Sequence, residues 1–224
     1  MAFHYSPKIT TDGLMLYFDA ANSKSYPGTG TAWTDISRNH FDSTLSSATF
    51  DADRRGSIVF NGSTSYASGP SISVGDFGTI NVWFKQDSPI VNKGLFSIGT
   101  STFFYIGGSG ASTKIAIYNG TIYSSQIDIT RAYSWNMATY AWSGASASLY
   151  LNADPSTAVS SSISFATTGS YYVGVYGSLS PSSYFNGRIS NVQVYNRRLS
   201  LEEITENYTA IKSRYNSNTN DMPM

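Results

Sequence analysis

The stretch Asn186–Tyr215, NGRISNVQVYNRRLSLEEITENYTAIKSRY, has the pattern of a strand followed directly by a helix. From Gly187 to Tyr195 apolar and polar residues alternate, which predicts a β-strand. The alternation slips once at Ser190-Asn191, and this slip predicts a β-bulge or a change of the buried face. The strand is expected to end before Leu199, where a helical pattern begins.

A helix is predicted over residues 200–215. Ser200 lies three residues before Glu203, which is the spacing of a capping box, and Leu199 and Ile204 have the spacing of a hydrophobic staple. One apolar stripe at helical spacing follows, made of Leu201, Ile204, Tyr208, Ile211 and Tyr215. No other segment has a convincing helical pattern and no active-site pattern lies in this one, so we expect a helix that docks on a β-rich domain.

Short strands separated by turn residues are predicted along the rest of the chain, at about ten residues per strand, as in sandwiches and jelly rolls. They cover residues 13–20, 57–60, 80–84, 95–98, 103–106, 115–118, 122–129, 137–142, 148–151, 160–165 and 171–175. Asn119-Gly120 predicts a two-residue hairpin turn. The strand over Ile80–Phe84 is expected to contribute to the central core, and Asn22–Asn39 is expected to be a long loop of the kind that carries specificity.

The chain is expected to form one domain over residues 12–215, with an N-terminal arm over 1–11 and a flexible tail over 216–224. Its 224 residues are enough for a core between two sheets. The arm contains Phe3, His4 and Tyr5. It is either a frayed end or an assembly arm that packs its aromatic rings on a neighbouring molecule.

Composition narrows the classes of partner. Charged residues make up 12% of the chain, about half the usual ~25%. The net charge is zero and no block of Lys or Arg occurs, so we expect no nucleic-acid partner. The absence of cysteine excludes disulfides and thiolate metal sites. Residues 1–8 lack a signal-peptide pattern and no apolar run approaches ~18 residues, so we expect a soluble protein, made in a cytoplasm, without a membrane partner.

The run Phe185–Ile204 resembles the closing strand and helix of laminin-G-like domains, and so do three further segments, 13–20, 56–62 and 149–152. These domains belong to the concanavalin A-like lectin/glucanase superfamily. The resemblance, over residues 12–215, implies an all-β fold: a two-sheet jelly-roll sandwich whose first strand pairs beside its last, with one C-terminal α-helix. Because this sandwich occurs in lectins, glucanases, adhesion modules and virion proteins, it leaves the function open.

A second resemblance concerns the opening segments. Ala20–Asn22 and Ser25–Gly28, leading to Trp33–Ser37, are similar to small structural proteins of tailed bacteriophages. This similarity implies a virion protein made in the host cytoplasm, as a capsid decoration or a tail or fibre component. Its partners would be other virion proteins or copies of itself.

Hydrolysis of a glycosidic bond needs two carboxylates beside the bond, and glucanases of this superfamily commonly place them on one strand as E-x-D-x-E. The three glutamates here, Glu202, Glu203 and Glu206, all lie on the predicted helix. Asp51 and Asp53 are the nearest acidic pair, but they lie in a predicted turn. His4 and His40 lie in the arm and a loop, without a nucleophile or zinc motif. We therefore expect no enzyme activity.

No cofactor is expected, with calcium as the alternative. Several relatives in the superfamily bind calcium through loop carboxylates, ligands that suit a hard cation. The best candidates are Asp19 and Asp35, although neither lies in a dense run of acidic residues. Aspartates in turns normally accept hydrogen bonds from backbone N–H groups instead.

Sugar binding uses an aromatic ring as a stacking platform together with polar groups for the hydroxyls. The candidates in loop-like stretches are Tyr26, Trp33, Tyr66 and Tyr184. With 17 tyrosines in the chain, packing or a protein interface is the competing interpretation.

We therefore expect a non-catalytic structural protein of a phage virion with a lectin-like fold, for which binding of a cell-surface polysaccharide is an added role. A free-standing carbohydrate-binding module is the alternative, and a glycoside hydrolase is the third hypothesis.

Overall fold

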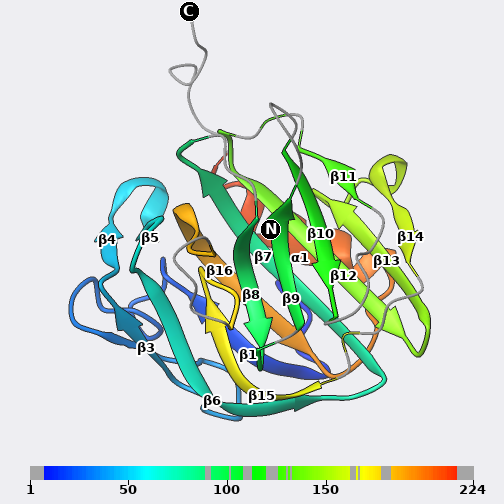
Figure 1. Cartoon of the computed structure of the whole chain (residues 1–224), viewed down its shortest axis with the longest axis horizontal. Helices are drawn as coiled ribbons and strands as arrows, with labels where there is room; N and C mark the ends of the chain where they lie inside the picture. Colours follow the sequence, from blue (N-terminus) through cyan, green and yellow to red (C-terminus); the bar gives the residue numbers. More distant parts are fainter. Residues whose placement is uncertain are drawn as a thin grey trace, which may run out of the picture.

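The computed structural model describes residues 8–88, 92–100, 102–107, 113–119, 126–129, 131, 133–161, 165, 167–177 and 183–215. Two antiparallel β-sheets pack face to face, and one helix lies on the outer side of one sheet (Figure 1). This confirms the expected all-β sandwich with a C-terminal helix.

The candidate arm residues Phe3, His4 and Tyr5 and the predicted tail lie outside the described residues. Within these ranges no helix is long and apolar enough to span a membrane.

Sheet A is the sheet that carries the helix, and it has eight strands. In spatial order these are β14 (Val159–Ser161), β13 (Ser146–Leu151), β12 (Asn136–Ser143), β7 (Phe77–Gln86), β16 (Asn186–Tyr195), β5 (Ser57–Asn61) and β4 (Thr49–Asp51), with β1 (Leu14–Asp19) also paired to β16.

Sheet B also has eight strands. In spatial order these are β11 (Ile127–Asp128), β10 (Lys114–Tyr118), β9 (Thr102–Gly107), β8 (Lys93–Ile98), β15 (Thr167–Val173), β6 (Tyr66–Val74), β3 (Ser43–Ser46) and β2 (Ala32–Trp33). Two short 3-10 turns, η1 (Asp53–Arg55) and η2 (Pro155–Thr157), and the helix α1 (Leu201–Lys212) complete the described elements.

Strand β16 organises sheet A. One of its edges pairs with β7, while its other edge pairs with β5 over Asn186–Ile189 and with β1 over Asn191–Tyr195. The register with β7 shifts between Ile189 and Asn191, which confirms the predicted bulge. The pairing of β1 with β16 confirms that the first strand lies beside the last. The bulge falls where the partner of β16 changes from β5 to β1.

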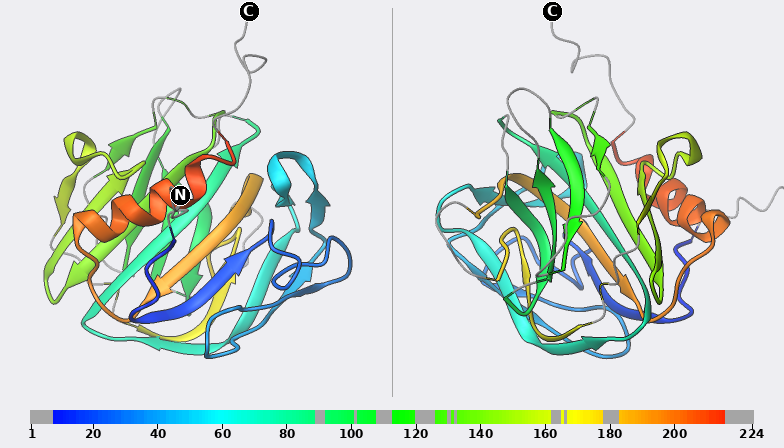
Figure 2. Two further views of the ribbon diagram at one scale, coloured as in Figure 1. Left: turned by 180° about the vertical axis from the view of Figure 1, so that it is seen from behind. Right: turned by 45° about the vertical axis from the view of Figure 1, so that its right-hand side comes forward.

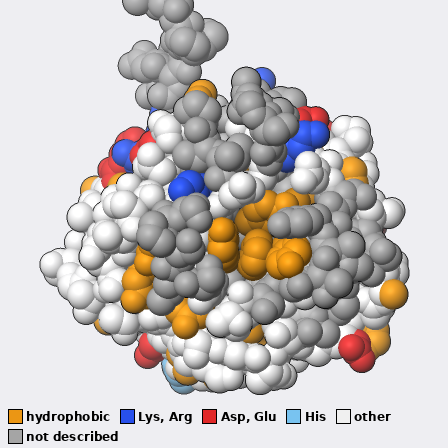
Figure 3. Space-filling view, viewed as in Figure 1, with side chains coloured by type: hydrophobic (Ala, Val, Ile, Leu, Met, Phe, Trp, Pro, Cys, Tyr) orange, Lys and Arg blue, Asp and Glu red, His pale blue; other side chains and the backbone are white. Residues whose placement is uncertain are grey.

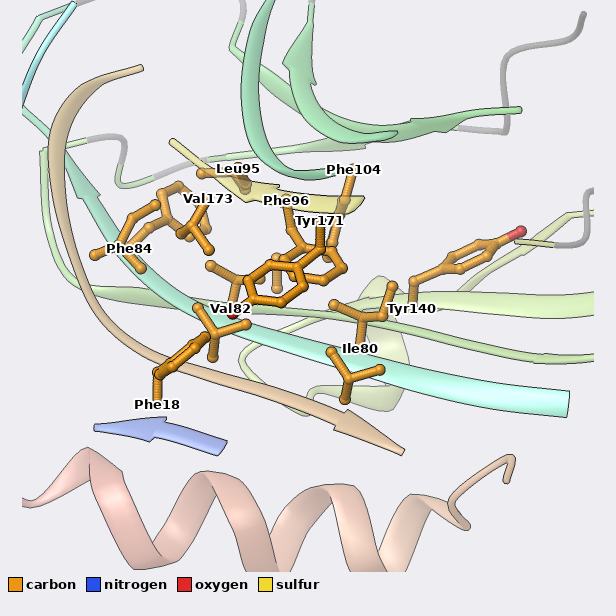
Figure 4. Packing of buried hydrophobic residues seen from close by; sticks show 14 of the residues in the cluster. Phe18, Ile80, Val82, Phe84, Leu95, Phe96, Phe104, Tyr140, Tyr171 and Val173 are labelled. Atoms are coloured by element: carbon orange, nitrogen blue, oxygen red, sulfur yellow. The ribbon is translucent and has the colours of Figure 1, made fainter. Parts of the chain in front are cut away.

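The core lies between the two sheets. Ile80, Val82 and Phe84 of β7 point toward side chains of β8, β9 and β15 (Figure 4). Tyr171 of β15 is fully buried, and its hydroxyl donates to the Phe41 carbonyl at 2.6 Å. These side chains alternate along each strand with residues of the outer faces.

The expected contribution of Ile80–Phe84 to the core is confirmed by Ile80, Val82 and Phe84, whereas Trp83 lies on the opposite face of β7, beneath α1. It is 1% exposed and is covered by the rings of Tyr208 and Tyr215, at centroid distances of 5.3 and 4.9 Å. Val82 and Phe84 occupy the inward positions of β7, so Trp83 between them must point outward. The helix therefore covers an aromatic side chain that the sandwich alone would leave in water.

Both ends of α1 are fixed by polar contacts. At the N-terminus the capping box is present: the Ser200 hydroxyl accepts from the Glu203 N–H at 3.3 Å, and the Glu203 carboxylate accepts from the Ser200 N–H at 2.9 Å. Arg197 donates two further hydrogen bonds to Glu203, at 2.6 and 2.9 Å. Beyond the C-terminus, Arg214 donates two hydrogen bonds to the buried carboxylate of Asp19, at 2.6 and 2.7 Å.

The apolar stripe of the helix begins one turn later than expected. Ile204 and Ile211 are buried in the cluster around Trp83, which also contains Leu199, as the hydrophobic staple predicts. Leu201 is 37% exposed and does not join the stripe. A register shift in β1 also places Leu14 in this cluster, away from Leu16 and Phe18 in the core.

Several strands differ from the sequence-based expectation. Strand β6 was not expected, because Gly69 and Pro70 are typical turn residues. In the structure they coincide with a register shift against β15, and the Tyr171 ring fills the space of a Cβ at residue 69. Strand β15 begins at Thr167, and the short strands β2, β3 and β4 have no counterpart in the expectation. Strand β11 covers Ile127–Asp128 of the strand expected over 122–129, of which residues 122–125 lie outside the described residues. Gly120 of the predicted hairpin turn lies outside the described residues.

Acidification is expected to weaken the docking of α1. Hydrogen bonds from Arg197 lower the pKa of Glu203 from the usual 4.5 to about 2. A carboxyl whose pKa is lower in the folded than in the unfolded state stabilises the fold above the unfolded pKa and loses this effect as the pH falls through the folded pKa. Glu203→Gln should therefore lower the thermal midpoint at neutral pH and flatten its decline between about pH 5 and pH 2.

The matched control is Glu202→Gln, which removes the neighbouring, exposed carboxylate. Circular dichroism melts at several pH values give the midpoints. Identical pH profiles for wild type and Glu203→Gln would contradict the prediction.

Candidate functional site

The outer face of sheet B is the candidate binding surface. The helix covers much of the outer face of sheet A, whereas in the described residues no helix lies on sheet B (Figure 2). Side chains on this face alternate with core residues such as Ala67, Phe104 and Val173.

The strand register aligns one row of outward-facing side chains across six strands of sheet B. From β3 to β10 the row contains Thr44, Ser68, Tyr172, Ser97, Phe103 and Tyr118. Five strand spacings of about 4.8 Å give the row a length of roughly 24 Å. The row runs perpendicular to the strands, but Ser97 is fully buried and Phe103 is 9% exposed, so its accessible side chains lie toward its two ends.

Three tyrosines gather near one end of this row, and we call them the tyrosine cluster: Tyr66, Tyr172 and Tyr184. The ring of Tyr66 lies 6.4 Å from that of Tyr172 and 6.2 Å from that of Tyr184. All three are half-buried, so part of each side chain is accessible. Hydroxyl side chains lie beside them, since Ser46 pairs with Tyr66 and Ser68 pairs with both Thr44 and Tyr172.

A second aromatic group, the Phe103 cluster, lies near the other end of the row. It contains Phe103, Tyr105, Ala116, Tyr118 and Tyr176. The rings of Phe103 and Tyr176 stack at 4.5 Å, and Tyr118 lies 4.9 Å from Phe103. In the space-filling view, hydrophobic side chains gather in the middle of this face (Figure 3).

The segment Gly174–Gly177 brings Tyr176 onto the face by crossing over β8. The Ser97 hydroxyl donates to the Val175 carbonyl at 3.2 Å. A Cβ at Gly94 would lie 2.3 Å from the backbone of Val175 and Tyr176, so this close approach requires glycine. The crossing segment lies between the tyrosine cluster and the Phe103 cluster.

The face is almost neutral. The described strands of sheet B contain three charged residues, Lys93, Lys114 and Asp128. Lys114 and Asp128 form an ion pair at 3.5 Å near the edge of the sheet. The surface offers stacking and neutral hydrogen bonds, and little electrostatic attraction for a charged ligand.

Two of the four candidate sugar-binding residues, Tyr66 and Tyr184, come together in the tyrosine cluster. The other two are buried. Tyr26 is 4% exposed, and its hydroxyl donates to the Gly30 carbonyl at 2.9 Å. Trp33 is fully buried, with its ring 4.9 Å from that of Phe18. The loop that contains them folds back onto the sandwich, so neither ring is available as a stacking platform.

The two calcium candidates are fully engaged by protein donors. The buried carboxylate of Asp35 accepts four hydrogen bonds of 2.8–2.9 Å, from the N–H groups of Tyr17, Ser37 and Phe41 and from the Ser37 hydroxyl. Asp19 binds Arg214 through both oxygens. In the described part of the chain, no group of three or more His, Asp or Glu residues gathers as a metal site.

Tyr172, Phe103, Tyr118 and Tyr176 were not identified from the sequence. The alternation of Tyr171, Tyr172 and Val173 shows that Tyr172 faces away from its neighbours, and this is the one local signal that points to it. The alignment of Tyr172 with Phe103 and Tyr118 depends on pairing between strands far apart in sequence.

Two antiparallel sheets packed face to face, with a single C-terminal helix on one outer face, are the architecture of a lectin-like β-sandwich domain. The chain belongs to the concanavalin A-like lectin/glucanases superfamily (Laminin_G_3), whose family model matches residues 60–205. No curated protein sequence matches the chain.

Several solved structures are similar in fold. Domain 4 of AbnA, a GH43 extracellular arabinanase from Geobacillus stearothermophilus in complex with arabinotriose, has a TM-score of 0.64 at 14% identity, covering 89% of this chain and 100% of that domain. The binding domain of Paraclostridial Mosquitocidal Protein 1 has a TM-score of 0.63 at 16% identity, covering 92% of this chain and 53% of that one. Trypanosoma rangeli sialidase in complex with 2,3-difluorosialic acid has a TM-score of 0.63 at 16% identity, covering 93% of this chain and 35% of the sialidase.

At these identities the similarity shows the fold alone. The chain spans all of domain 4 of the arabinanase, but only about a third of the sialidase and about half of the mosquitocidal binding domain.

Calcium is expected to leave the stability unchanged, because the oxygens of Asp19 and Asp35 already accept hydrogen bonds from the protein. Calcium bound only by the folded state, at about 100 times its Kd, would raise the free energy of unfolding by ~2.7 kcal/mol. Urea unfolding in calcium chloride and in EDTA should give the same value. A calcium-dependent increase of that size would contradict the prediction.

Proposed function

We propose that this chain is a non-catalytic carbohydrate-binding domain whose ligand lies along the outer face of sheet B. The observation that carries the proposal is the tyrosine cluster, in which Tyr66, Tyr172 and Tyr184 combine half-exposed rings from three separate segments. The C–H face of a sugar packs on such rings, while its hydroxyls hydrogen-bond to neighbouring polar groups and ordered water. Ser46, Ser68 and Thr44 provide hydroxyls beside the rings.

The length and charge of the surface favour a neutral oligosaccharide over a single sugar. The row from Thr44 to Tyr118 extends over roughly 24 Å, and beyond Ser97 the half-buried rings of Tyr118 and Tyr176 provide a second stacking region. The weak charge of the face gives no preference for an acidic ligand. Domain 4 of the arabinanase was solved with arabinotriose, which makes that trisaccharide a suitable first probe.

A binding role is favoured over hydrolysis by the placement of the acidic residues. Asp128 is the one acidic residue on the described strands of sheet B, and it is paired with Lys114. Glu202, Glu203 and Glu206 lie on α1, which packs against the other sheet. Two carboxylates facing one sugar bond, as glycosidases need, are not built on the described strands of sheet B.

We also propose that the domain is carried by a tailed-phage particle, as a capsid decoration or a tail or fibre component. The support is the similarity of residues 20–37 to phage structural proteins and a chain with 12% charged residues. Virion proteins or copies of this chain would then be its partners. Mass spectrometry of purified particles tests this location, and absence of the chain from the particles would contradict it.

Removing a ring of the tyrosine cluster should weaken oligosaccharide binding. Stacking of a planar or apolar ligand face on one aromatic ring contributes ~1–3 kcal/mol, so Tyr172→Ala or Tyr66→Ala should raise the Kd by roughly 5- to 150-fold. Calorimetric titration with arabinotriose and a panel of neutral oligosaccharides measures the change.

Tyr133→Ala is the matched control, because Tyr133 is 53% exposed and lies outside both aromatic clusters. Circular dichroism establishes that each variant is folded. Equal affinities of Tyr172→Ala and Tyr133→Ala, or no binding of any oligosaccharide in the panel, would overturn the proposed surface. Release of reducing sugar from a bound polysaccharide by the pure protein would overturn the non-catalytic role.

A further inference from the structure

A polar pocket lies on the outer face of sheet A, on the opposite side of the sandwich from the tyrosine cluster. Its volume is about 90 Å³, which exceeds the ~10–15 Å³ that one water needs. It is lined by Asp51, Asp53, Arg54, Ser57, Lys85, Trp135 and Arg188.

The pocket is built on the half of sheet A in which β16 pairs with β5. Arg188 pairs with Lys85 on one side and Val59 on the other, and Asp51 pairs with Ser57. These positions alternate with core residues, so their side chains share the outer face. Helix α1 packs on Trp83 of β7, on Met137 and Ala141 of β12 and on Tyr195 of β16. The pocket begins near the C-terminal end of the helix, where Tyr215 packs on Trp135, and reaches β4 and β5 through Asp51 and Ser57.

The charges of the pocket leave one cation without a direct counter-ion. Arg188 is neutralised by Asp51, at 2.8 Å, and by Asp87. The hydrogen bond from Arg188 lowers the pKa of Asp51, and the charge of nearby Lys85 adds to this effect. Yet the ammonium group of Lys85 forms no ion pair with any residue in the described ranges. The pocket therefore has an available positive charge beside a fixed carboxylate.

A second observation points to a ligand. Ser57 is 1% exposed, and its hydroxyl has no hydrogen-bond partner among the residues that the structure describes, although it lines the pocket. A buried hydroxyl without a partner is costly unless something in the pocket satisfies it. Trp135 adds an apolar wall, held in place by stacking on Tyr215 at 4.4 Å.

We propose that this pocket binds the carboxylate-bearing unit of an acidic saccharide. Lys85 pairs with the ligand's carboxylate, Ser57 hydrogen-bonds to it or to an adjoining hydroxyl, and Asp51 accepts from a ligand hydroxyl. The Trp135 ring packs on the apolar face of the sugar. A bare anion would contact only the Lys85 ammonium group, and a neutral sugar would leave that group without a counter-ion. The pocket therefore favours a ligand that carries both a carboxylate and sugar hydroxyls. This site is independent of the proposed binding surface on sheet B.

Titration with sodium glucuronate, D-glucose and sodium acetate, followed by amide and indole N–H signals in NMR spectra, tests this site. Glucuronate should bind at least about tenfold more tightly than glucose or acetate and shift the indole signal of Trp135, since a charge-assisted hydrogen bond is roughly twice as strong as a neutral one. Lys85→Gln should raise the Kd for glucuronate at least about tenfold. Lys24→Gln, which removes an exposed cation that does not line the pocket, should not.

Ser57→Ala is the second variant. Because this hydroxyl has no partner in the described chain, its removal should weaken glucuronate binding without lowering the thermal midpoint. Tyr172→Ala should leave glucuronate binding unchanged, which separates this site from the surface on sheet B. Absence of glucuronate binding, equal binding of glucose, or equal affinities of Lys85→Gln and Lys24→Gln would each overturn the proposal.

Discussion

The packing of α1 on Trp83 determines which surfaces of this sandwich remain accessible. A two-layer β-structure buries only its inner faces, yet β7 carries a tryptophan on its outer face. Tyr208 and Tyr215 cover this ring, and the ion pair between Arg214 and Asp19 fixes the chain just beyond the helix. Much of sheet A is thereby closed by the chain's own C-terminal segment. The broad aromatic face of sheet B and the small polar pocket beyond the helix are left as the two candidate contact regions.

The parts of the fold that could be predicted are those encoded within a few residues. The capping box at Ser200, the bulge after Ile189 and most of the long strands have local signals, and the structure contains them. Alternation identifies which residues share a face, but it does not say which face is inward. For that reason the strand around Trp83 could be predicted, but the packing of Trp83 against α1 could not. Strand β6 was missed because Gly69 and Pro70 resemble a turn, and only the ring of Tyr171 explains the glycine.

Of the candidate binding surface, Tyr66 and Tyr184 could be predicted from the sequence and the other aromatic residues could not. Tyr66 and Tyr184 are 118 positions apart and yet lie in one cluster, so residue type alone was a useful guide to them. Tyr26 and Trp33 are aromatic residues of the same kind, but hydrogen bonds of the Ser25, Asp35 and Ser37 side chains tie their segment to β1, and no local pattern predicts these bonds. Tyr172 and Phe103 depend on cross-strand register. The polar pocket likewise depends on register, because Lys85, Arg188 and Ser57 become neighbours only when β5, β7 and β16 pair.

The positions of the two ends of the described chain determine how such a domain would be presented. Near the start, the Thr10 N–H donates to Asn207 of α1 at 2.8 Å, and at the other end Tyr215 packs against Trp83 and stacks on Trp135. Both ends thus lie on the side of sheet A. A carrier that approached the domain from this side would leave the tyrosine cluster, on the opposite face of the sandwich, open to the surroundings without a change in the fold.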